Sequence, residues 1–366
     1  MRNMLISFPD MTRYLKLFVS AALSMLCIGA HSQALYTELN FDGLFDNREY
    51  KNDMLPQTIY GMRFMPKIGF VYENSALIGG FTKIWEFGAD DAIDPEIILY
   101  YGYKGNKWNA MFGVIPRDEL QRQLPDALLY DSIAYFEPTI SGTLFQRHGQ
   151  VFQTELYCNW FSRQTETNRE AFRIVWDGCL SYNGKNVDVS NHDLIHAGWF
   201  VTMTHWAKPK EAGHYIYDQF QFNPYIGFDL SGKFDSDLRL KVNAGLLYSM
   251  VRCRKDGDWH KPAGFLGDIQ LGWKMFDIKT TVYKGGKQQP FLNDSEAGLA
   301  FHRSDPFYNH SEYLKTEFKV ELINIRNVLM GFSWNIHKTP GSPIHNQQLI
   351  TFEYGIGMRK DLHDQK

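Results

Sequence analysis

The sequence predicts an all-β protein, a transmembrane antiparallel β-barrel of about 16 strands with short periplasmic turns and long outer loops. Three observations predict this class. Apolar and polar residues alternate with a period of two along most of the chain. The connections between the alternating segments are short and long in turn. A segment typical of an export signal precedes the first of them.

The composition agrees with a folded protein that does not bind nucleic acid. Of the 366 residues, 44% are hydrophobic and 22% are charged, and the net charge is −3. A disordered chain would have fewer apolar residues and a larger net charge. Nucleic-acid binding usually needs a basic surface, so we expect no nucleic-acid partner.

The first residues have the features of a signal peptide. Arg13 and Lys16 supply positive charge and lead into an apolar stretch that ends at the small residues Ala30 and Ser32. Positive charge, an apolar stretch and a small-x-small site are typical of a cleaved export signal. We therefore predict that residues 1–33 form a signal peptide and that the protein is exported to the outer membrane.

Met11 is an alternative start to Met1, because the charged part of the signal follows it. The rest of the chain divides into a barrel and a tail. Residues 34–358 carry the alternating segments, and we predict that they form one barrel domain. Residues 359–366 are polar and form a C-terminal tail.

Alternation defines each predicted strand. In the segment 313–323, Leu314 and Phe318 fall on one face, and Lys315 and Glu317 fall on the other. The same reasoning along the chain predicts strands at 35–43, 57–73, 76–88, 95–104, 107–116, 135–147, 151–162, 170–182, 195–206, 219–230, 236–250, 264–274, 277–284, 313–323, 327–337 and 347–358.

The lengths of the connections indicate a membrane barrel. Tight turns are predicted after the even-numbered strands, and longer connections follow the odd-numbered ones, with 117–134 and 285–312 the longest. Only 183–194, after the eighth strand, is long where a tight turn is expected. Outer-membrane barrels have short periplasmic turns and long outer loops. The pattern also places both ends of the barrel at the short-turn side.

These features resemble the porin-like β-barrels of the Gram-negative outer membrane. Aromatic residues such as Trp108 and Trp160 lie near strand ends, where interfacial girdles occur. The segment 107–120 resembles a porin strand that continues into a constriction loop, and HRSDPFYNHSEY (302–313) is most similar to barrel proteins of the Bacteroidetes.

The resemblance implies an outer-membrane channel for passive diffusion of small hydrophilic solutes. Its expected partners are these solutes and outer-membrane lipid, and a homo-oligomer is an open alternative. Two other functions are kept as hypotheses. One is a closed-lumen barrel with an enzymatic (lipid hydrolase) or structural role. The other is a secreted soluble β-sandwich that binds ligands.

Charged residues on the inward face are the predicted pore lining. A charge on the lipid side costs about 2–4 kcal/mol at the membrane midplane, so alternation places these side chains in the lumen. They form either a water-filled pore or a closed, salt-bridged lumen. With one loop residue, Arg117, the candidates are Arg63, Lys67, Arg147, Arg173, Arg239, Lys241, Lys315, Glu317, Lys319, Glu321 and Glu353.

The connection 117–134 is predicted to narrow the pore. Its leucines recur at near-helical spacing, and it contains Arg117, Asp118, Arg122 and Asp126 as further lining candidates. We expect this loop to fold inward as a constriction. The alternative is a helix that lies across the mouth.

No catalytic residue, metal site or cofactor is assigned from the sequence. His302 and Ser304 have the spacing of the His-Ser pair of barrel phospholipases, which they resemble. In that family, however, the pair lies upstream of an RSDP-like segment, whereas here it overlaps Arg303–Pro306. A nucleophile, its base and an orienting group must lie within mutual reach.

Overall fold

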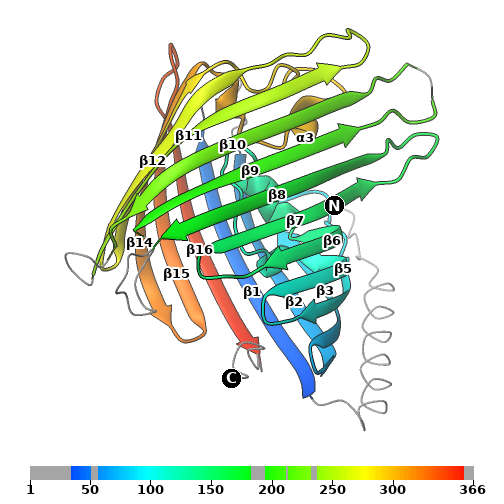
Figure 1. Ribbon diagram of the computed structural model, residues 1–366, viewed down its shortest axis with the longest axis vertical. Helices are drawn as coiled ribbons and strands as arrows, with labels where there is room; N and C mark the ends of the chain where they lie inside the picture. Colours follow the sequence, from blue (N-terminus) through cyan, green and yellow to red (C-terminus); the bar gives the residue numbers. More distant parts are fainter. Residues whose placement is uncertain (1–33, 51–56, 183–193, 212, 232–236, 358–366) are drawn as a thin grey trace, which may run out of the picture.

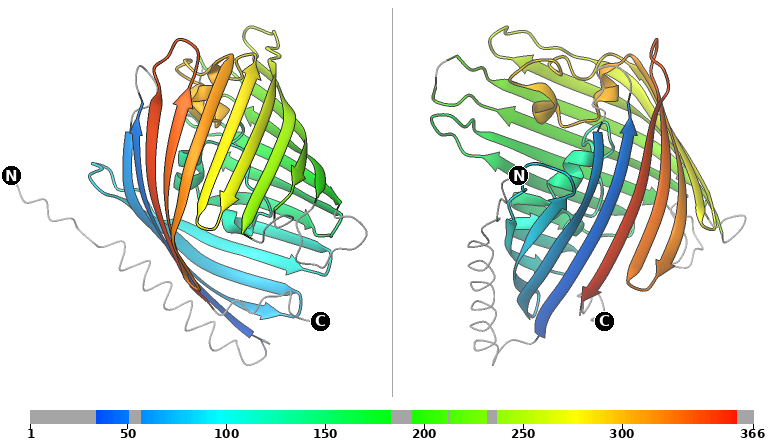
Figure 2. Two further views of the ribbon diagram at one scale, coloured as in Figure 1. Left: turned by 90° about the vertical axis from the view of Figure 1, so that its left-hand side faces the viewer. Right: turned by 180° about the vertical axis from the view of Figure 1, so that it is seen from behind.

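One sheet of antiparallel strands closes on itself and forms a barrel (Figures 1 and 2). The structure is a computed structural model that describes residues 34–50, 57–182, 194–211, 213–231 and 237–357. Within these residues the strands are β1 (Ala34–Glu49), β2 (Gln57–Tyr72), β3 (Ser75–Glu86), β4 (Glu96–Lys104), β5 (Trp108–Pro116), β6 (Thr139–Arg147), β7 (Phe152–Ser162), β8 (Ala171–Tyr182), β9 (Ile195–Trp206), β10 (Tyr217–Asp229), β11 (Leu238–Cys253), β12 (Ala263–Trp273), β13 (Phe276–Gly285), β14 (Glu312–Ile325), β15 (Val328–Lys338) and β16 (His345–Gly357).

Four short helices lie in the two longest connections. They are η2 (Arg117–Glu119) and α2 (Asp131–Phe136) in the first, and α3 (Gly298–His302) and η3 (Pro306–Asn309) in the second. Figure 2 shows α2 and α3 inside the ring of strands. None of the helices among the described residues is long and apolar enough to cross a membrane.

The predicted class and strand number are confirmed. Strand β1 pairs with β2 on one side and with β16 on the other, which closes the barrel. A soluble β-sandwich is therefore the wrong alternative, because a sandwich packs two sheets face to face. The predicted signal peptide 1–33 and tail 359–366 lie outside the described residues and stay predictions.

Two strand boundaries differ from the prediction by four residues or more. Strand β1 continues to Glu49 rather than ending at 43, because residues beyond Gly43 keep pairing with β2 and β16. Strand β6 begins at Thr139 rather than 135, because α2 and Pro138 precede it. Proline lacks the N–H that a central strand needs, so the ladder starts after it.

The predicted alternation of connections is confirmed for the connections that the structure describes in full. Turns of two to four residues join β2 to β3, β4 to β5, β6 to β7, β12 to β13 and β14 to β15. Connections of at least six residues leave the opposite end, including 117–138 and 286–311. Ala34 pairs with Val71 and Glu38 pairs with Gly357, so both ends of the barrel lie on the short-turn side.

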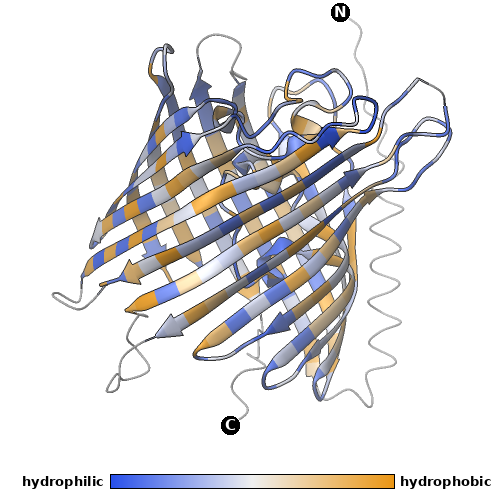
Figure 3. Ribbon diagram, turned by 45° about the horizontal axis from the view of Figure 1, so that its top comes forward, coloured by the Kyte–Doolittle hydropathy of each residue, from blue (hydrophilic) through white to orange (hydrophobic). Residues whose placement is uncertain are grey.

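The outward face of the barrel is apolar, as lipid contact requires. On β4, Leu99 is 53% exposed, whereas its neighbour Tyr100 points inward and is 2% exposed. Hydrophobic and hydrophilic residues alternate in this way along the strands (Figure 3). In a soluble protein this outer surface would be an extensive apolar patch.

The inner wall is not uniformly polar. Between β2 and β8 it carries a buried apolar cluster that includes Ile98, Tyr100 and Leu144, and Leu120 and Leu124 of the connection 117–138 pack against this cluster. Both leucines are partly buried, so each stabilises the loop inside the barrel by less than the ~1.5–3 kcal/mol of a fully buried leucine. The packing fixes the loop against one side of the lumen.

Candidate functional site

The connection 117–138, called the plug loop here, crosses the lumen. The Asp118 carboxylate binds Lys67 of β2 at 3.0 Å. Arg122 then donates to the Gly178 carbonyl of β8 at 3.0 Å, on the other side of the barrel. The predicted inward fold of this loop is therefore confirmed, and the alternative helix across the mouth is wrong.

The second half of the plug loop returns across the lumen to the first strands. Asp126 binds Lys315 of β14 at 2.6 Å. Asp131 binds Arg48 of β1 at 3.0 Å, and Arg48 also donates to Asp46 through Nε at 2.9 Å. Since Arg48 and Asp46 are almost fully buried, these contacts hold the loop in one position.

The connection 286–311, called the lid loop here, packs on the plug loop from the long-loop side. The backbone N–H of Tyr130 donates to Arg303 O at 2.8 Å, and the N–H of Asp305 donates to Asp126 O at 2.9 Å. The Arg303 side chain also pairs with Glu137. Together the two loops lie inside the barrel and contact its inner wall on β2, β8 and β14.

The loops divide the predicted lining residues into two groups. The first group contacts the loops. Lys67 and Lys315 hold plug-loop carboxylates, Arg173 donates to Leu128 O at 2.7 Å, and Arg117 donates to Glu137 O at 2.6 Å. These four side chains anchor loops in the structure, so they favour the closed, salt-bridged lumen over a water-filled pore.

The second group makes ion pairs between neighbouring strands. Arg239 pairs with Asp277 at 2.8 Å and Lys241 with Asp229 at 3.1 Å. Arg63 pairs with Asp42 at 2.6 Å and also donates to the plug-loop carbonyl of Tyr135 at 3.2 Å, so it belongs to both groups. The inward-facing Glu317, Lys319, Glu321 and Glu353 lie on the same side of the barrel. Several of these charges are already paired across strands.

Arg147 does not face the lumen, and its predicted inward position is wrong. It shares a face with Phe145, which is exposed on the outside, and its guanidinium lies 5.7 Å from the ring of the exposed Trp108. Arg147 is the last residue of β6, next to a short turn, where a long basic side chain can reach the membrane interface. Proximity to the interface removes the cost that excludes charges from the midplane.

His302 and Ser304 do not form a catalytic pair. Both are fully buried in the lid loop. His302 Nε2 accepts from the backbone N–H of Phe291 at 3.2 Å, and Ser304 Oγ accepts from Gln289 at 2.7 Å. Burial lowers the pKa of His302 to about 3, so its ring is neutral and structural.

We expect the stability of the lid loop to depend on pH through Asp305. Burial, and then the nearby Asp126 carboxylate, raise the pKa of Asp305 to about 7, while its side chain accepts from the N–H of Phe307 at 2.9 Å. A raised pKa contributes stability that is complete below the unfolded value of about 4 and is lost as the pH rises through 7. We expect amide exchange in η3, corrected for intrinsic rates, to be faster at pH 8 than at pH 5.

The matched variant is Asp305→Asn, which keeps an acceptor for Phe307 and cannot ionise. Its exchange protection should not change between pH 5 and pH 8. An equal pH dependence in the variant and in the natural protein would show that Asp305 is not the group responsible.

A cluster of ionisable residues lies on the outward face at the long-loop ends of the strands. His205 of β9 and Asp218 of β10 are opposite each other in register, and His205 Nδ1 lies 2.8 Å from Asp218 Oδ1. The neighbouring outward position on β11 is Arg252, whose Nε donates to Asp218 Oδ2 at 2.9 Å. Arg254 joins them from the loop through its own Nε at 2.8 Å.

Aromatic residues border this outer cluster. Phe172 of β8 pairs with His205 in register, and its ring stacks on Trp160 of β7 at 5.1 Å. On the other side, the Arg252 guanidinium lies 4.4 Å from the ring of Trp259. Aromatic belts of this kind mark the level of the lipid headgroups. The His205–Asp218 pair lies beside these aromatic residues, in register with Phe172.

In the outer cluster, only His205 lies in a predicted strand, 195–206. Asp218 and Arg252 lie just outside the predicted strands 219–230 and 236–250, and the structure adds them to β10 and β11. One feature of the sequence could have indicated them. By alternation, His205, Asp218 and Arg252 fall on the same outward face as the lipid-facing apolar residues of their strands. Charges on that face are expensive unless they lie at an interface or serve a function.

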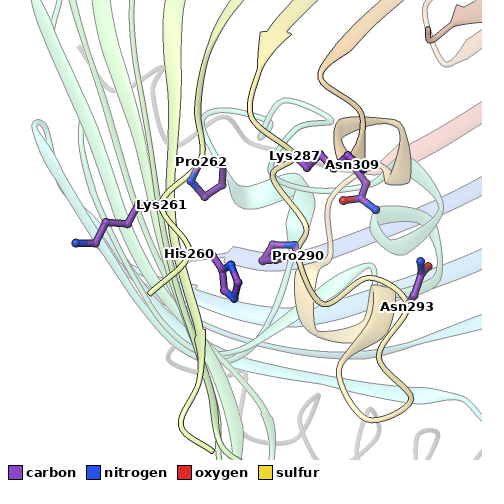
Figure 4. Close-up of a pocket in the computed structure, with 7 residues that line it drawn as sticks. All are labelled: His260, Lys261, Pro262, Lys287, Pro290, Asn293 and Asn309. Atoms are coloured by element: carbon purple, nitrogen blue, oxygen red, sulfur yellow. The ribbon is translucent and has the colours of Figure 1, made fainter. Parts of the chain in front are cut away.

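A pocket of about 470 Å³ opens beside the outer cluster, between the loop 254–262 and the lid loop. Figure 4 shows His260 and Pro262 on one side and Lys287, Pro290 and Asn309 on the other. The remaining lining residues are Lys261, whose ammonium group points away from the pocket, and Asn293. No group of three or more His, Cys, Asp or Glu side chains within the described part of the chain could hold a metal ion.

The fold and the charged lumen define an outer-membrane β-barrel of porin-like architecture, as structural comparison confirms. Three solved structures of Pseudomonas aeruginosa proteins are similar. OccK9 (OpdG) has a TM-score of 0.52 and 10% identity, and the match covers 89% of this chain and 99% of that chain. The outer membrane protein OprD has a TM-score of 0.52 and 10% identity, with coverage of 90% and 96%, and OccK5 (OpdH) has a TM-score of 0.53 and 8% identity, with coverage of 89% and 99%. At these identities the likeness concerns the fold alone.

The chain belongs to the family described as lipid A 3'-O-deacylase-type, which matches residues 28–362. A comparison with curated proteins finds no match. The resemblance to Bacteroidetes barrels is not tested by these comparisons and stays a prediction.

Proposed function

We propose that this protein hydrolyses an ester-linked acyl chain of lipid A at the outer surface of the barrel, with His205 as general base and Asp218 as the residue that orients it. The observation that carries the proposal is the contact of 2.8 Å between His205 Nδ1 and Asp218 Oδ1 on the outward face. Membership in the lipid A 3'-O-deacylase-type family supports the substrate class.

The pair has the geometry that base catalysis needs. A hydrogen bond from Nδ1–H to Asp218 assigns the proton to Nδ1 and leaves the Nε2 lone pair available. Among the described residues, no hydrogen-bond partner of Nε2 is present, and the His205 side chain is 23% exposed. A water molecule can therefore approach Nε2 from the membrane interface.

The chemistry follows from that arrangement. His205 Nε2 takes a proton from water as the water oxygen attacks the acyl carbonyl carbon. The tetrahedral intermediate breaks its bond to the sugar oxygen, and that oxygen receives the proton from Nε2. The products are a free fatty acid and a sugar hydroxyl. The Asp218 carboxylate holds the ring and stabilises its charged form during the transfer.

The location supports a lipid substrate. The ester bonds of an outer-leaflet glycolipid lie between the headgroup and the acyl chains, which is the level of the Trp160–Phe172 pair. The plug and lid loops also agree with a reaction on the outer wall, because they leave less space for diffusion through the barrel.

Lipid A in detergent micelles tests the proposal. We expect the purified barrel to convert it to a species lighter by one acyl chain, with release of one equivalent of fatty acid, as measured by mass spectrometry. Unchanged lipid A after prolonged incubation with a folded, heat-modifiable barrel would contradict the proposed activity.

The second candidate function is a selective channel for small hydrophilic solutes. Inward charges, such as Lys241 and Lys319, favour it, and the fold of the OprD and Occ proteins is compatible with it. Single-channel recording in a planar bilayer distinguishes the two. The plug loop predicts silence, whereas stable conductance steps that shift with salt would favour the channel.

A further inference from the structure

We infer that Arg252 and Arg254 form a phosphate-binding site for the headgroup of an outer-leaflet glycolipid. The inference rests on the proposed function, because it names the group that would hold the same lipid beside His205. The supporting observation is that the Asp218 carboxylate forms ion pairs with both guanidinium groups on the outer wall of the barrel.

Asp218 contacts each arginine through the edge that includes Nε. Arg252 Nε donates to Oδ2 at 2.9 Å, while Arg254 donates to Oδ2 through Nε at 2.8 Å and to Oδ1 through Nη2 at 3.1 Å. Within the described residues, no hydrogen bond occupies either Nη atom of Arg252 or Nη1 of Arg254. These N–H groups are available to a ligand.

The charge of the cluster is unbalanced. Two guanidinium groups face one carboxylate, so the ion pairs leave one positive charge in excess. The Arg254 side chain is 46% exposed and that of Arg252 is 29% exposed, whereas Asp218 is only 16% exposed. An approaching ligand therefore meets the guanidinium groups and not the carboxylate.

Trp259 limits the freedom of one arginine. Its ring lies 4.4 Å from the Arg252 guanidinium, which is the distance of a cation–π contact. A planar guanidinium that is already oriented loses less entropy when it binds, and its forked donors match two oxygens of a phosphate group. The site is thus built for an oxyanion with several oxygens.

The position selects a lipid phosphate rather than a soluble one. The arginines lie on the outward face, in register with the aromatic residues at headgroup level, so the ligand must approach from the side of the membrane. A phosphate on a lipid sugar would occupy this level, with its acyl esters slightly deeper. Inorganic phosphate shares the same chemistry and is the competing source.

Binding to an inactive barrel tests the inference separately from catalysis. The full chain carrying His205→Gln is titrated in detergent with bisphosphorylated lipid A, with the same lipid after removal of its phosphates, and with inorganic phosphate. Intrinsic tryptophan fluorescence or native mass spectrometry measures binding. We expect the phosphorylated lipid to bind most tightly.

Arg252→Gln combined with Arg254→Gln should weaken this binding by about 10- to 100-fold, because charge-assisted hydrogen bonds are lost. The pair Arg252→Lys and Arg254→Lys, which keeps the charge, should recover part of the affinity. Lys287→Gln is the matched control, since it removes a positive charge from the neighbouring pocket and should leave binding unchanged.

Equal binding of the lipid with and without its phosphates, or full affinity in the glutamine double variant, would overturn the inference. Arginine-dependent binding of inorganic phosphate without a preference for the lipid would overturn the assignment to a lipid headgroup. Because binding is measured without turnover, arginine-dependent binding by a barrel that never deacylates lipid A would contradict only the proposed function.

Discussion

His205→Gln is expected to lower the rate of lipid A deacylation by about 10²- to 10⁴-fold, the range that a positioned general base contributes. Glutamine keeps a polar side chain beside Asp218, but it cannot accept a proton from water at neutral pH. The measurement is the initial rate of fatty-acid release at saturating lipid. Heat-modifiability on gels checks that the barrel folds.

Two further variants make this prediction specific. His214→Gln is the control. His214 lies in the neighbouring outer loop, with its Nδ1 3.6 Å from Glu296 Oε1, and its replacement should leave the rate unchanged. Asp218→Asn should lower the turnover number, because the ring loses the carboxylate that orients it and stabilises its charged form. An unchanged rate in the His205→Gln variant would show that His205 is not the general base.

Arg48→Ala is expected to have the largest effect on stability. The Arg48 side chain is 2% exposed and binds Asp46, Asp131 and the Tyr130 hydroxyl. Removing it leaves the buried Asp46 carboxylate without its cation, which typically costs about 3–5 kcal/mol. The free energy of unfolding in urea, followed by tryptophan fluorescence in detergent, measures the loss.

The control is Arg239→Ala, which removes an inward ion pair with Asp277. That pair is partly solvated, with an exposed fraction of 36% for the Arg239 side chain, so the expected loss is only about 0–1 kcal/mol. Similar losses in the two variants would show that the plug loop does not depend on the Arg48 network.

The strands could be predicted because alternation is a local property. Strands β14 and β16 each have an apolar face of their own. The segments around Phe318 and Phe352 can therefore be predicted as strands without knowing which strands they pair with. The extension of β1 past Gly43 could not be predicted in the same way. It depends on pairing with β2 and β16, which only the closed sheet supplies.

The inward loop could be predicted in outline, but the strand residues that anchor it could not. The leucines and charges of 117–134 indicated a loop that folds inward. Its anchors, Lys67, Arg173 and Lys315, come from strands far apart in the sequence and meet the loop only inside the barrel. The lining charges therefore resembled a pore wall when considered strand by strand.

The outer cluster was missed for a related reason. His205, Asp218 and Arg252 lie on three strands, and no spacing in the sequence brings them together. In contrast, His302 and Ser304 are close in sequence and have the spacing of a catalytic pair. In the structure both are buried, and they bind Phe291 and Gln289 instead of each other. Proximity in the sequence was a weaker guide to a site than cross-strand register.

Lipid A deacylation by this protein is best tested in cells that express either the natural protein or the His205→Gln variant at equal levels. The measurement is the lipid A profile of their outer membranes. The proposed function predicts lipid A that lacks one ester-linked acyl chain only in cells with the natural protein. Identical, fully acylated lipid A in both strains would show that this barrel is not a lipid A esterase.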